Sequence, residues 1–334
     1  MLRLSSPSHE RLSQADHFNV DFGGAEANVA VALSNFKIDT QFLTRLPDNE
    51  LGNIALSVLR KYDVDVQQIL RGGRRLGIYF LEKGSMNRPS KIIYDRDFSS
   101  FAEIQPGMID WENIFEGAKW FHWSGITPAV SESAAKTCLE AIKTANSMGI
   151  KVSCDLNFRM NLWKYGKNPG EVMSELLEGC DLILSNEEDS RLFFGINPEN
   201  IDSQNDVLDE THFISIAKQL IKKFRRVKTV AFSYRRSINA DINLWSGFLF
   251  DGKVLYKSPI YELTDIVDRV GSGDSFMSGL IYGFLKYTGK NQMILDFATA
   301  SSCLKHSITG DFNLVSVEEV LQLMNGNTTG RIIR

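Results

Sequence analysis

The chain has 334 residues, with 37 Lys and Arg against 41 Asp and Glu, so its formal net charge is −4. Hydrophobic residues make up 43% and charged residues 23%, proportions of an ordinary globular protein that exclude a disordered or fibrous chain. The sequence pI of 5.8 offers no positive field for nucleic acid, and no apolar run approaches the ~18–20 residues of a membrane span.

Apolar periodicity predicts an α/β fold when the elements are taken in chain order. The first part is predicted to hold two helices followed by a β-hairpin, at 25–36, 51–62, 76–82 and 91–96. Later, short apolar strands at 152–156, 181–184 and 228–233 alternate with helices at 133–148 and 212–224. A turn at Asp251-Gly252 then separates two strand-like runs, and a last helix extends from Ser275 onward. Such alternation is typical of βαβ units with a mostly parallel, buried sheet. We predict one α/β domain over residues 1–334 with a small β appendage.

Several common catalytic and metal motifs are missing from the sequence. The four cysteines form no CxxC pair, and the five histidines show no ligand-like spacing, so no protein-held metal is predicted. The patterns GxxxxGK(S/T), HExxH and GxSxG do not occur either, which argues against a P-loop, a zinc protease or an α/β-hydrolase. The first twelve residues lack the apolar core of a signal peptide, so we expect a cytoplasmic protein with no nucleic-acid or membrane partner.

The segment 265–279, DIVDRVGSGDSFMSG, is the strongest candidate for chemistry. Gly271, Ser272 and Gly273 come directly before a helix that Asp274 or Ser275 opens, so unobstructed amides and the helix N-terminus can form an anion hole. Such a hole suits a phosphate or the charge that develops in phosphoryl transfer. Asp274 beside it could accept a proton from an attacking hydroxyl. The alternative is an ordinary glycine-rich turn with Asp274 as a helix cap.

A second candidate lies near the N-terminus, in the segment 21–28, DFGGAEAN. Its paired glycines let a ligand approach the backbone closely, and Asn28 could hydrogen-bond a hydroxyl. The alternative is a flexible helix start with a capping acid.

These two stretches, GGAEANVAVALSNF and DRVGSGDSF, resemble the two signatures of the ribokinase-like carbohydrate kinases, also called the phosphofructokinase B family. The signatures are a GG-containing helix start followed by Asn, and a D-x-x-G-x-G-D box. The likeness extends from about Leu2 to Glu319. Shorter stretches resemble the family members that act on 2-keto-3-deoxygluconate: GGAEAN, LPDNELG, GIYFLE, RPSKIIYDR, WSGITPA, DLNFR and SNEED.

The resemblance implies a fold and a partner. The fold is a parallel sheet flanked by helices, with a small β-sheet lid formed mainly by residues 71–100 and part of 1–22. The lid would cover a sugar cleft. Because an exposed sheet edge invites pairing, we expect a homo-oligomer built through the lid.

The resemblance also implies a reaction. The γ-phosphate of ATP would pass to the 6-hydroxyl of 2-keto-3-deoxygluconate, giving 2-keto-3-deoxy-6-phosphogluconate and ADP in sugar-acid catabolism. Mg²⁺ is expected with ATP and tends to keep its waters; whether a monovalent cation is a further cofactor stays open. The alternatives are a family kinase for a neutral sugar (fructose, ribose) or a nucleoside, and a catalytically silent sugar-binding protein.

Site residues follow from the resemblance, position by position. Asp274 would be the catalytic base, with Gly271, Ser272 and Gly273 as its anion hole. The implied sugar contacts are Gly24, Asn28, Tyr79, Tyr94, Arg96 and Arg159. The implied nucleotide contacts are Asn186, Glu187, Arg235, Gly271 and Gly273.

Two arginines are the candidate partners of a substrate carboxylate. Arg96 lies two residues after Tyr94, so both side chains share one face of a strand. A guanidinium offers a carboxylate a planar fork, which Arg159 could also provide. The alternative for each is a surface arginine paired with a neighbouring acid, Asp95 or Asp155.

Three features depart from the family pattern. The family begins with a strand before the stretch aligned with residues 1–5, so the chain is expected to start inside that strand. Relatives have a glycine-containing turn where residues 233–237 read SYRRS, and we expect Arg235 or Arg236 to reach the phosphates there. The box reads DRVGSGD instead of DTxGAGD. Ser272 therefore replaces an alanine, and Arg269 replaces a threonine. We expect Arg269 to lie on the nucleotide side.

Overall fold

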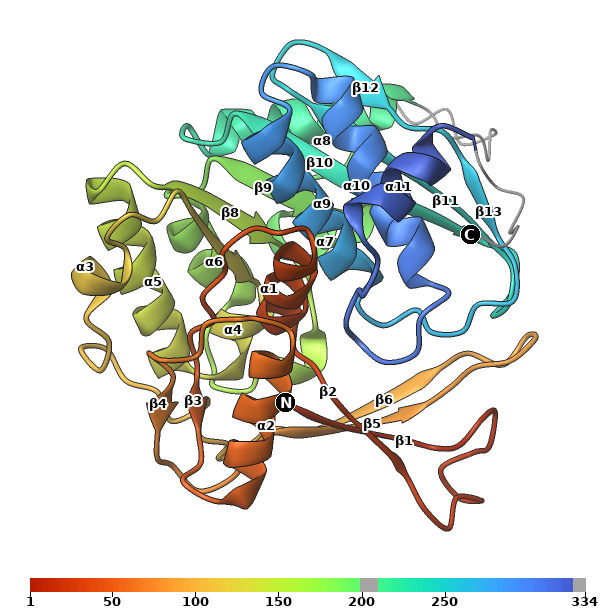
Figure 1. Cartoon of the computed structure of the whole chain (residues 1–334). Coiled ribbons are helices and arrows are strands. Elements are labelled where there is room, and N and C mark those ends of the chain that lie inside the picture. Colours follow the sequence, from red (N-terminus) through yellow and green to blue (C-terminus); the bar gives the residue numbers. More distant parts are fainter. Residues whose placement is uncertain (199–209, 327–334) are drawn as a thin grey trace.

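The computed structural model describes residues 1–198 and 210–326, and a seven-stranded sheet forms the centre of the molecule (Figure 1). Its strands are β7 (Trp120–Ser124), β8 (Lys151–Asp155), β9 (Leu182–Ser185), β10 (Thr229–Ser237), β11 (Asn243–Phe250), β12 (Leu255–Lys257) and β13 (Tyr261–Leu263). They lie in the order β12-β11-β10-β9-β8-β7, and β13 pairs with β11. From β7 to β10 the pairing is parallel, whereas β11 is antiparallel to all its partners. The predicted parallel-sheet core is therefore confirmed, with an antiparallel end.

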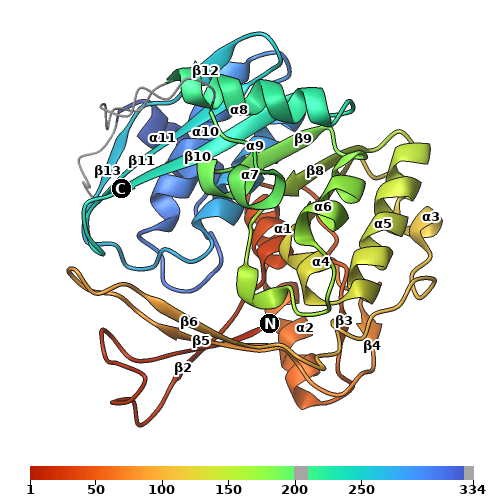
Figure 2. The same cartoon turned by 180° about the vertical axis from the view of Figure 1, so that it is seen from behind.

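Two layers of helices cover this sheet (Figures 1 and 2). One layer holds α5 (Glu132–Ser147), α6 (Pro169–Leu177), α7 (Glu187–Phe194) and α8 (Glu210–Lys223); the other holds α1 (Ala25–Asn35), α9 (Ser272–Lys286), α10 (Asn291–Lys305) and α11 (Val317–Met324). In β9, Ile183 packs toward the first layer, whereas Leu182 and Leu184 pack toward the second, because successive side chains on a strand alternate. None of the described helices is long and apolar enough to cross a membrane.

Shorter elements connect these layers. They are α2 (Glu50–Lys61), α3 (Trp111–Ile114), α4 (Ile126–Val130), the single 3₁₀ turn η1 (Met160–Leu162), and the paired short strands β3 (Arg45–Leu46) and β4 (Leu70–Arg71). The observed helix and strand limits differ from the predicted ones mostly by one or two residues, as fraying ends allow.

A separate four-stranded sheet projects from the main body (Figure 1). It consists of β1 (Leu2–Ser5), β2 (Asn19–Phe22), β5 (Ile78–Glu82) and β6 (Lys91–Asp95), in the order β2-β1-β5-β6. The hairpin predicted over 76–96 is β5 and β6, which pair antiparallel. The strand expected at the start of the chain is β1, and it belongs to this small sheet and not to the main one.

The strand predicted over 228–233 is longer in the structure. β10 continues through Ser237 and pairs with β11, so that Arg235 lies opposite Trp245. The place of the relatives' glycine-containing turn is therefore taken by extended chain. The two strand-like runs predicted on either side of the Asp251-Gly252 turn are β11, which begins at Asn243, and β12.

A buried ionic cluster fastens the small sheet to the main body. Arg3 of β1 is 0% exposed, and its guanidinium donates to the carboxylates of Asp268 (2.5 Å) and Asp311 (2.8 Å). Tyr79 of β5 donates its hydroxyl to the same Asp311 carboxylate at 2.6 Å. Since Asp268 begins the DRVGSGD box, β1 and β5 together hold the loop that leads into α9.

Replacing Arg3 should therefore destabilise the whole protein. Arg3→Met keeps the bulk of the side chain but leaves two buried carboxylates without this partner, which should lower the free energy of unfolding by about 3–5 kcal/mol. Urea denaturation would measure the change. Arg60→Met, at an exposed arginine of α2, is the matched control and should stay within about 0.5 kcal/mol of wild type. A loss below about 1 kcal/mol in Arg3→Met would contradict this role for the cluster.

Candidate active site

The first turn of α9 lies where the anion hole was predicted and has the backbone conformation that such a hole needs. Gly271 caps the helix with φ 83°, and a Cβ there would lie 2.1 Å from the carbonyl oxygen of Asp311, so only glycine fits. The helix begins at Ser272, two residues earlier than Asp274. First-turn amides have no partner inside their own helix. Gly271, Ser272 and Gly273 therefore lie at a helix N-terminus, which favours a negatively charged group, although the N–H of Ser272 already donates to the carbonyl of Arg269 at 3.4 Å.

The two signature stretches, 246 residues apart in sequence, meet at Asp274. Asn28 of α1 donates its side-chain amide to the Asp274 carboxylate at 2.6 Å, and its own amide oxygen accepts from the backbone N–H of Gly24 at 3.3 Å. Gly24 has φ 145°, a conformation that favours glycine. Asn28 is buried, so the structure uses its amide to orient Asp274.

Three carboxylates converge beside the anion hole. Burial raises the pKa of Asp274 to about 7 and that of Asp189 to about 6. Asp155, at the end of β8, has its pKa raised well above the usual range by burial and by the carboxylates of Asp274 and Asp189. The carboxylate of Asp155 lies 3.8 Å from the position that a Cβ on Gly273 would take. Asp274 is consequently suited to accept a proton near neutral pH.

Arg235 lies on the other side of the anion hole. Its guanidinium donates to the Ser272 hydroxyl at 2.8 Å, contacts the Nε2 atom of His306 at 3.2 Å and stacks over Trp245 at 5.0 Å. Burial, reinforced by the charge of Arg269, lowers the pKa of Arg235 to about 10. Within the described residues no carboxylate lies within 4 Å of Arg235, so its charge can serve an anionic ligand.

Arg96 and Arg159 are not paired with the acids that sequence reasoning offered them. Asp95 instead forms a two-pronged ion pair with Arg75, at 2.6 and 2.7 Å. Arg96 has no carboxylate within 4 Å in the described part of the chain, and one of its Nη atoms is buried without a hydrogen-bond partner. Arg159 is exposed and donates a hydrogen bond to the carbonyl of the preceding residue. Its positive charge lowers the pKa of Asp155, against the larger rise that burial causes.

The two predicted tyrosines face each other on the small sheet. Tyr79 and Tyr94 are direct cross-strand neighbours, with ring centres 6.4 Å apart. Tyr79 is buried, and its hydroxyl belongs to the Arg3 cluster through Asp311. Tyr94 is half-buried and lies two residues before Arg96, which follows the end of β6 and is half-buried as well.

Asn186 caps α7. Its side-chain oxygen accepts from the backbone N–H of Asp189 at 2.7 Å, and its amide donates to the Asp189 carboxylate at 3.0 Å. Glu187 is the first residue of α7, and its side chain lies outside the described part of the structure. Over residues 1–198 and 210–326, no group of three or more His, Cys, Asp or Glu side chains could hold a metal ion. The two nearby carboxylates, Asp155 and Asp189, suit a Mg²⁺ ion that arrives with its waters and phosphates.

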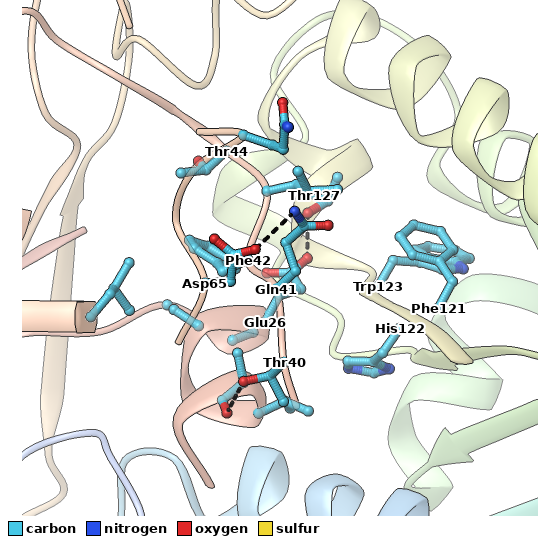
Figure 3. A pocket seen from close by; sticks show the side chains of 18 of the residues that line it. Glu26, Thr40, Gln41, Phe42, Thr44, Asp65, Phe121, His122, Trp123 and Thr127 are labelled. Carbon is cyan, nitrogen blue, oxygen red and sulfur yellow. Dashed lines mark hydrogen bonds between the residues drawn. The ribbon is translucent and has the colours of Figure 1, made fainter. Parts of the chain in front are cut away.

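A cavity of about 980 Å³ lies away from this convergence (Figure 3). It borders the edge of β7 with which no other described strand pairs. Figure 3 shows Phe121, His122 and Trp123 of β7 on one side, and Thr40, Gln41, Phe42 and Thr44 across from them. Beside these residues, the carboxylate of Glu26 accepts a hydrogen bond from the hydroxyl of Thr127 at 2.5 Å (Figure 3). Of the predicted site residues only Gly24 and Arg96 line this cavity, so it is not where the candidate catalytic groups meet.

Comparison with known proteins gives the family. Residues 1–234 match the model of the pfkB family carbohydrate kinases. The chain belongs to this family. The predicted resemblance is thereby confirmed, and the chain is a sugar kinase with the ribokinase-like fold.

Three relatives illustrate how close the similarity is. A crystal structure of 2-dehydro-3-deoxygluconokinase from Thermotoga maritima shares 45% identity, with a TM-score of 0.91 over 98% of this kinase and 97% of that chain. A pfkB family carbohydrate kinase from Listeria grayi shares 30% identity, with a TM-score of 0.88 over 97% of each chain. The 2-dehydro-3-deoxygalactonokinase of Haloferax volcanii is 29% identical over 99% of this kinase and 96% of its own length.

Sequence reasoning missed several residues of the site. Arg3 and Asp311 gave no local signal, because the two are partners 308 residues apart, and Lys305 gave none because tertiary packing buries it. Trp245 could have been found, since the stretch NLWSGFLF from Asn243 is rich in the apolar and aromatic residues that are typical of a strand.

The pKa of Asp274 predicts how this kinase responds to pH. A base with a pKa near 7 is protonated below that pH, so kcat/KM should fall about tenfold per pH unit under it and level off above it. A pH profile with the best sugar substrate would measure this limb. Asp274→Asn should keep the fold and sugar binding but lose most turnover, about 100-fold or more. Near-wild-type turnover in Asp274→Asn would refute the role of Asp274 as the base.

Proposed function

We propose that this kinase transfers the γ-phosphate of ATP to the 6-hydroxyl of 2-keto-3-deoxygluconate, giving 2-keto-3-deoxy-6-phosphogluconate and ADP. The observation that carries this proposal is the Asp274 carboxylate, held by Asn28 beside the first turn of α9. The names of the Thermotoga and Haloferax relatives both denote kinases of 2-keto-3-deoxy sugar acids, which supports the substrate class.

In this proposal Asp274 takes the proton of the 6-hydroxyl as the oxygen attacks the γ-phosphorus. A new O–P bond forms in line with the bond to ADP that breaks. The amides of Gly271–Gly273 and the N-terminus of α9 stabilise the transferring group. Because little covalent chemistry falls to the protein, positioning and charge stabilisation supply most of the rate.

The nucleotide side of the site is proposed to include Arg235, Gly271 and Gly273. Arg235 lacks a carboxylate partner among the described residues and is already oriented by Ser272, which favours a role with the phosphates. Mg²⁺ bound to ATP would neutralise phosphate charge, with Asn186, Glu187 and Asp189 as the α7 residues that could meet it through water.

The sugar side is proposed to include Gly24, Tyr94, Arg96 and Arg159. The two arginines would bind the substrate carboxylate, because both carry a charge that no nearby acid in the described chain pairs with. Asn28 and Tyr79, which the resemblance also assigns to the sugar, would act through Asp274 and Asp311 instead.

The small sheet is proposed to act as a lid over the sugar, since it carries Tyr94 and Arg96 and is fastened to the main body by Arg3. Several apolar side chains on it are exposed, among them Val20, Ile92 and Ile93. A second copy of the chain pairing here would cover them, which favours a homo-oligomer through the lid. Light scattering that gives the mass of a monomer would refute this assembly.

A second substrate has a specific observation in its favour. The Haloferax relative is named for the galactonate epimer, so 2-keto-3-deoxygalactonate is a candidate beside 2-keto-3-deoxygluconate. Both acids would present the same carboxylate to Arg96 and Arg159. As epimers, they differ only in the configuration of one carbon atom that carries a hydroxyl group.

A coupled ADP-release assay tests the proposed function. Mg-ATP would be offered with 2-keto-3-deoxygluconate, 2-keto-3-deoxygalactonate, fructose and ribose, and we expect turnover on the acids alone. Arg96→Gln and Arg159→Gln should each raise KM for the acid about 10–100-fold, since each removes a charge-assisted hydrogen bond. Arg74→Gln, at an exposed arginine, is the control and should leave KM unchanged. Equal turnover on fructose or ribose, or arginine variants with wild-type KM, would overturn the acid-sugar assignment.

A further inference from the structure

Lys305, the last residue of α10, is 0% exposed. Lysine is almost never fully buried unless its charge is paired. Its Nζ atom donates to the carbonyl of Ile308 at 3.1 Å. No step of the proposed mechanism uses this buried cation.

The side chain of Lys305 lies directly behind the anion hole. Its Cε atom is 3.5 Å from the position that a Cβ on Gly271 would take. Burial lowers the pKa of Lys305 to about 8, and the carboxylates of Asp268, Asp311 and Asp274 oppose that shift. The ammonium is therefore charged at neutral pH and faces the acids around the first turn of α9.

The two buried acids behind the hole are already satisfied. Asp268 accepts from Arg3 (2.5 Å), from the backbone N–H of Val270 (3.1 Å) and from that of Gly310 (3.2 Å). Asp311 accepts from Arg3 (2.8 Å) and from the hydroxyl of Tyr79 (2.6 Å).

The charges of this region are balanced without any added ion. Two cations, Arg3 and Lys305, stand against the two carboxylates of Asp268 and Asp311; Arg3 forms ion pairs with both, and Lys305 acts on them at longer range. Asp21, the remaining acid near Arg3, is 30% exposed and 3.9 Å away, so water screens it. A monovalent cation placed behind Gly271 would lie beside two fixed cations, and the carboxylate of Asp274, the further buried acid there, is already held by Asn28, so the residues present do not fit such an ion.

We propose that the ammonium of Lys305 takes the place of a monovalent cation in this kinase, holding positive charge behind Gly271–Gly273 so that the phosphates of ATP bind without added K⁺ or Na⁺. Lys305 is a positioning residue here, because it acts through the helix N-terminus and touches neither the sugar nor the reacting atoms. The proposal rests on the proposed function in one respect, that ATP is the phosphoryl donor.

Salt exchange on the wild-type protein tests this first. ATP affinity by calorimetry and the melting temperature would be measured in KCl, NaCl and choline chloride, each at about 0.1 M so that screening is equal. We expect both quantities to be the same in all three salts. Tighter ATP binding or a higher melting temperature in KCl or NaCl than in choline chloride would overturn the proposal.

Lys305→Met then removes the charge and keeps most of the volume. In choline chloride it should bind ATP about tenfold or more weakly and lose about 100-fold in kcat, and K⁺ or ammonium should restore part of the affinity. Lys218→Met, at an exposed lysine of α8, is the matched control and should change nothing. A folded Lys305→Met protein with wild-type ATP affinity and no response to K⁺ would overturn the proposal. If this variant does not fold, the wild-type salt series decides.

The two proposals fail in different ways. ATP affinity and melting temperature need no sugar, so they report on Lys305 whatever the acceptor is. Ion-independent ATP binding together with no turnover of either keto-deoxy acid would refute the proposed substrate and support the role of Lys305. Turnover of the acid that requires K⁺ would support the substrate and refute the role of Lys305.

Discussion

Four buried charges beneath the first turn of α9 constrain the rest of the structure. Arg3, Lys305, Asp268 and Asp311 come from β1, α10 and two separate loops, and none could be buried alone without a large desolvation cost. Arg3 pairs with both carboxylates, and Lys305 adds a second positive charge close to them. The small sheet, the loop into α9 and the end of α10 must therefore adopt their native arrangement together, which gives the anion hole a fixed position relative to Tyr94 of β6 and to Arg96, which follows this strand.

The same cluster explains how a site crowded with acids can receive phosphates. Asp155, Asp189 and Asp274 all lie near the hole, and their mutual repulsion contributes to raised pKa values at Asp155. Against them stand the helix N-terminus, Arg235 in front of the hole and Lys305 behind it. Side chains on both sides of one helical turn thus balance the charge. The pKa of Asp274 stays near that of a general base, because burial and not contact with a cation is its largest cause.

The sequence predicted the features that depend on neighbouring residues. Gly271 and Asp274 were found because a glycine-rich turn before a helix is a local pattern, and the alternation of strands and helices predicted the main sheet. Asn28 was singled out as a sugar contact, but the structure gives it Asp274, 246 residues away, as a partner, and that contact could not be foreseen. Arg3 and Lys305 look like ordinary surface residues in the sequence, since only tertiary contacts bury them.

A crystal structure with 2-keto-3-deoxygluconate and a non-hydrolysable ATP analogue is the most direct test of this account. We predict the 6-hydroxyl within hydrogen-bond distance of the Asp274 carboxylate, the γ-phosphate on the amides of Gly271–Gly273, and the sugar carboxylate on Arg96 or Arg159. A sugar carboxylate that meets neither Arg96 nor Arg159, or a 6-hydroxyl turned away from Asp274, would contradict it.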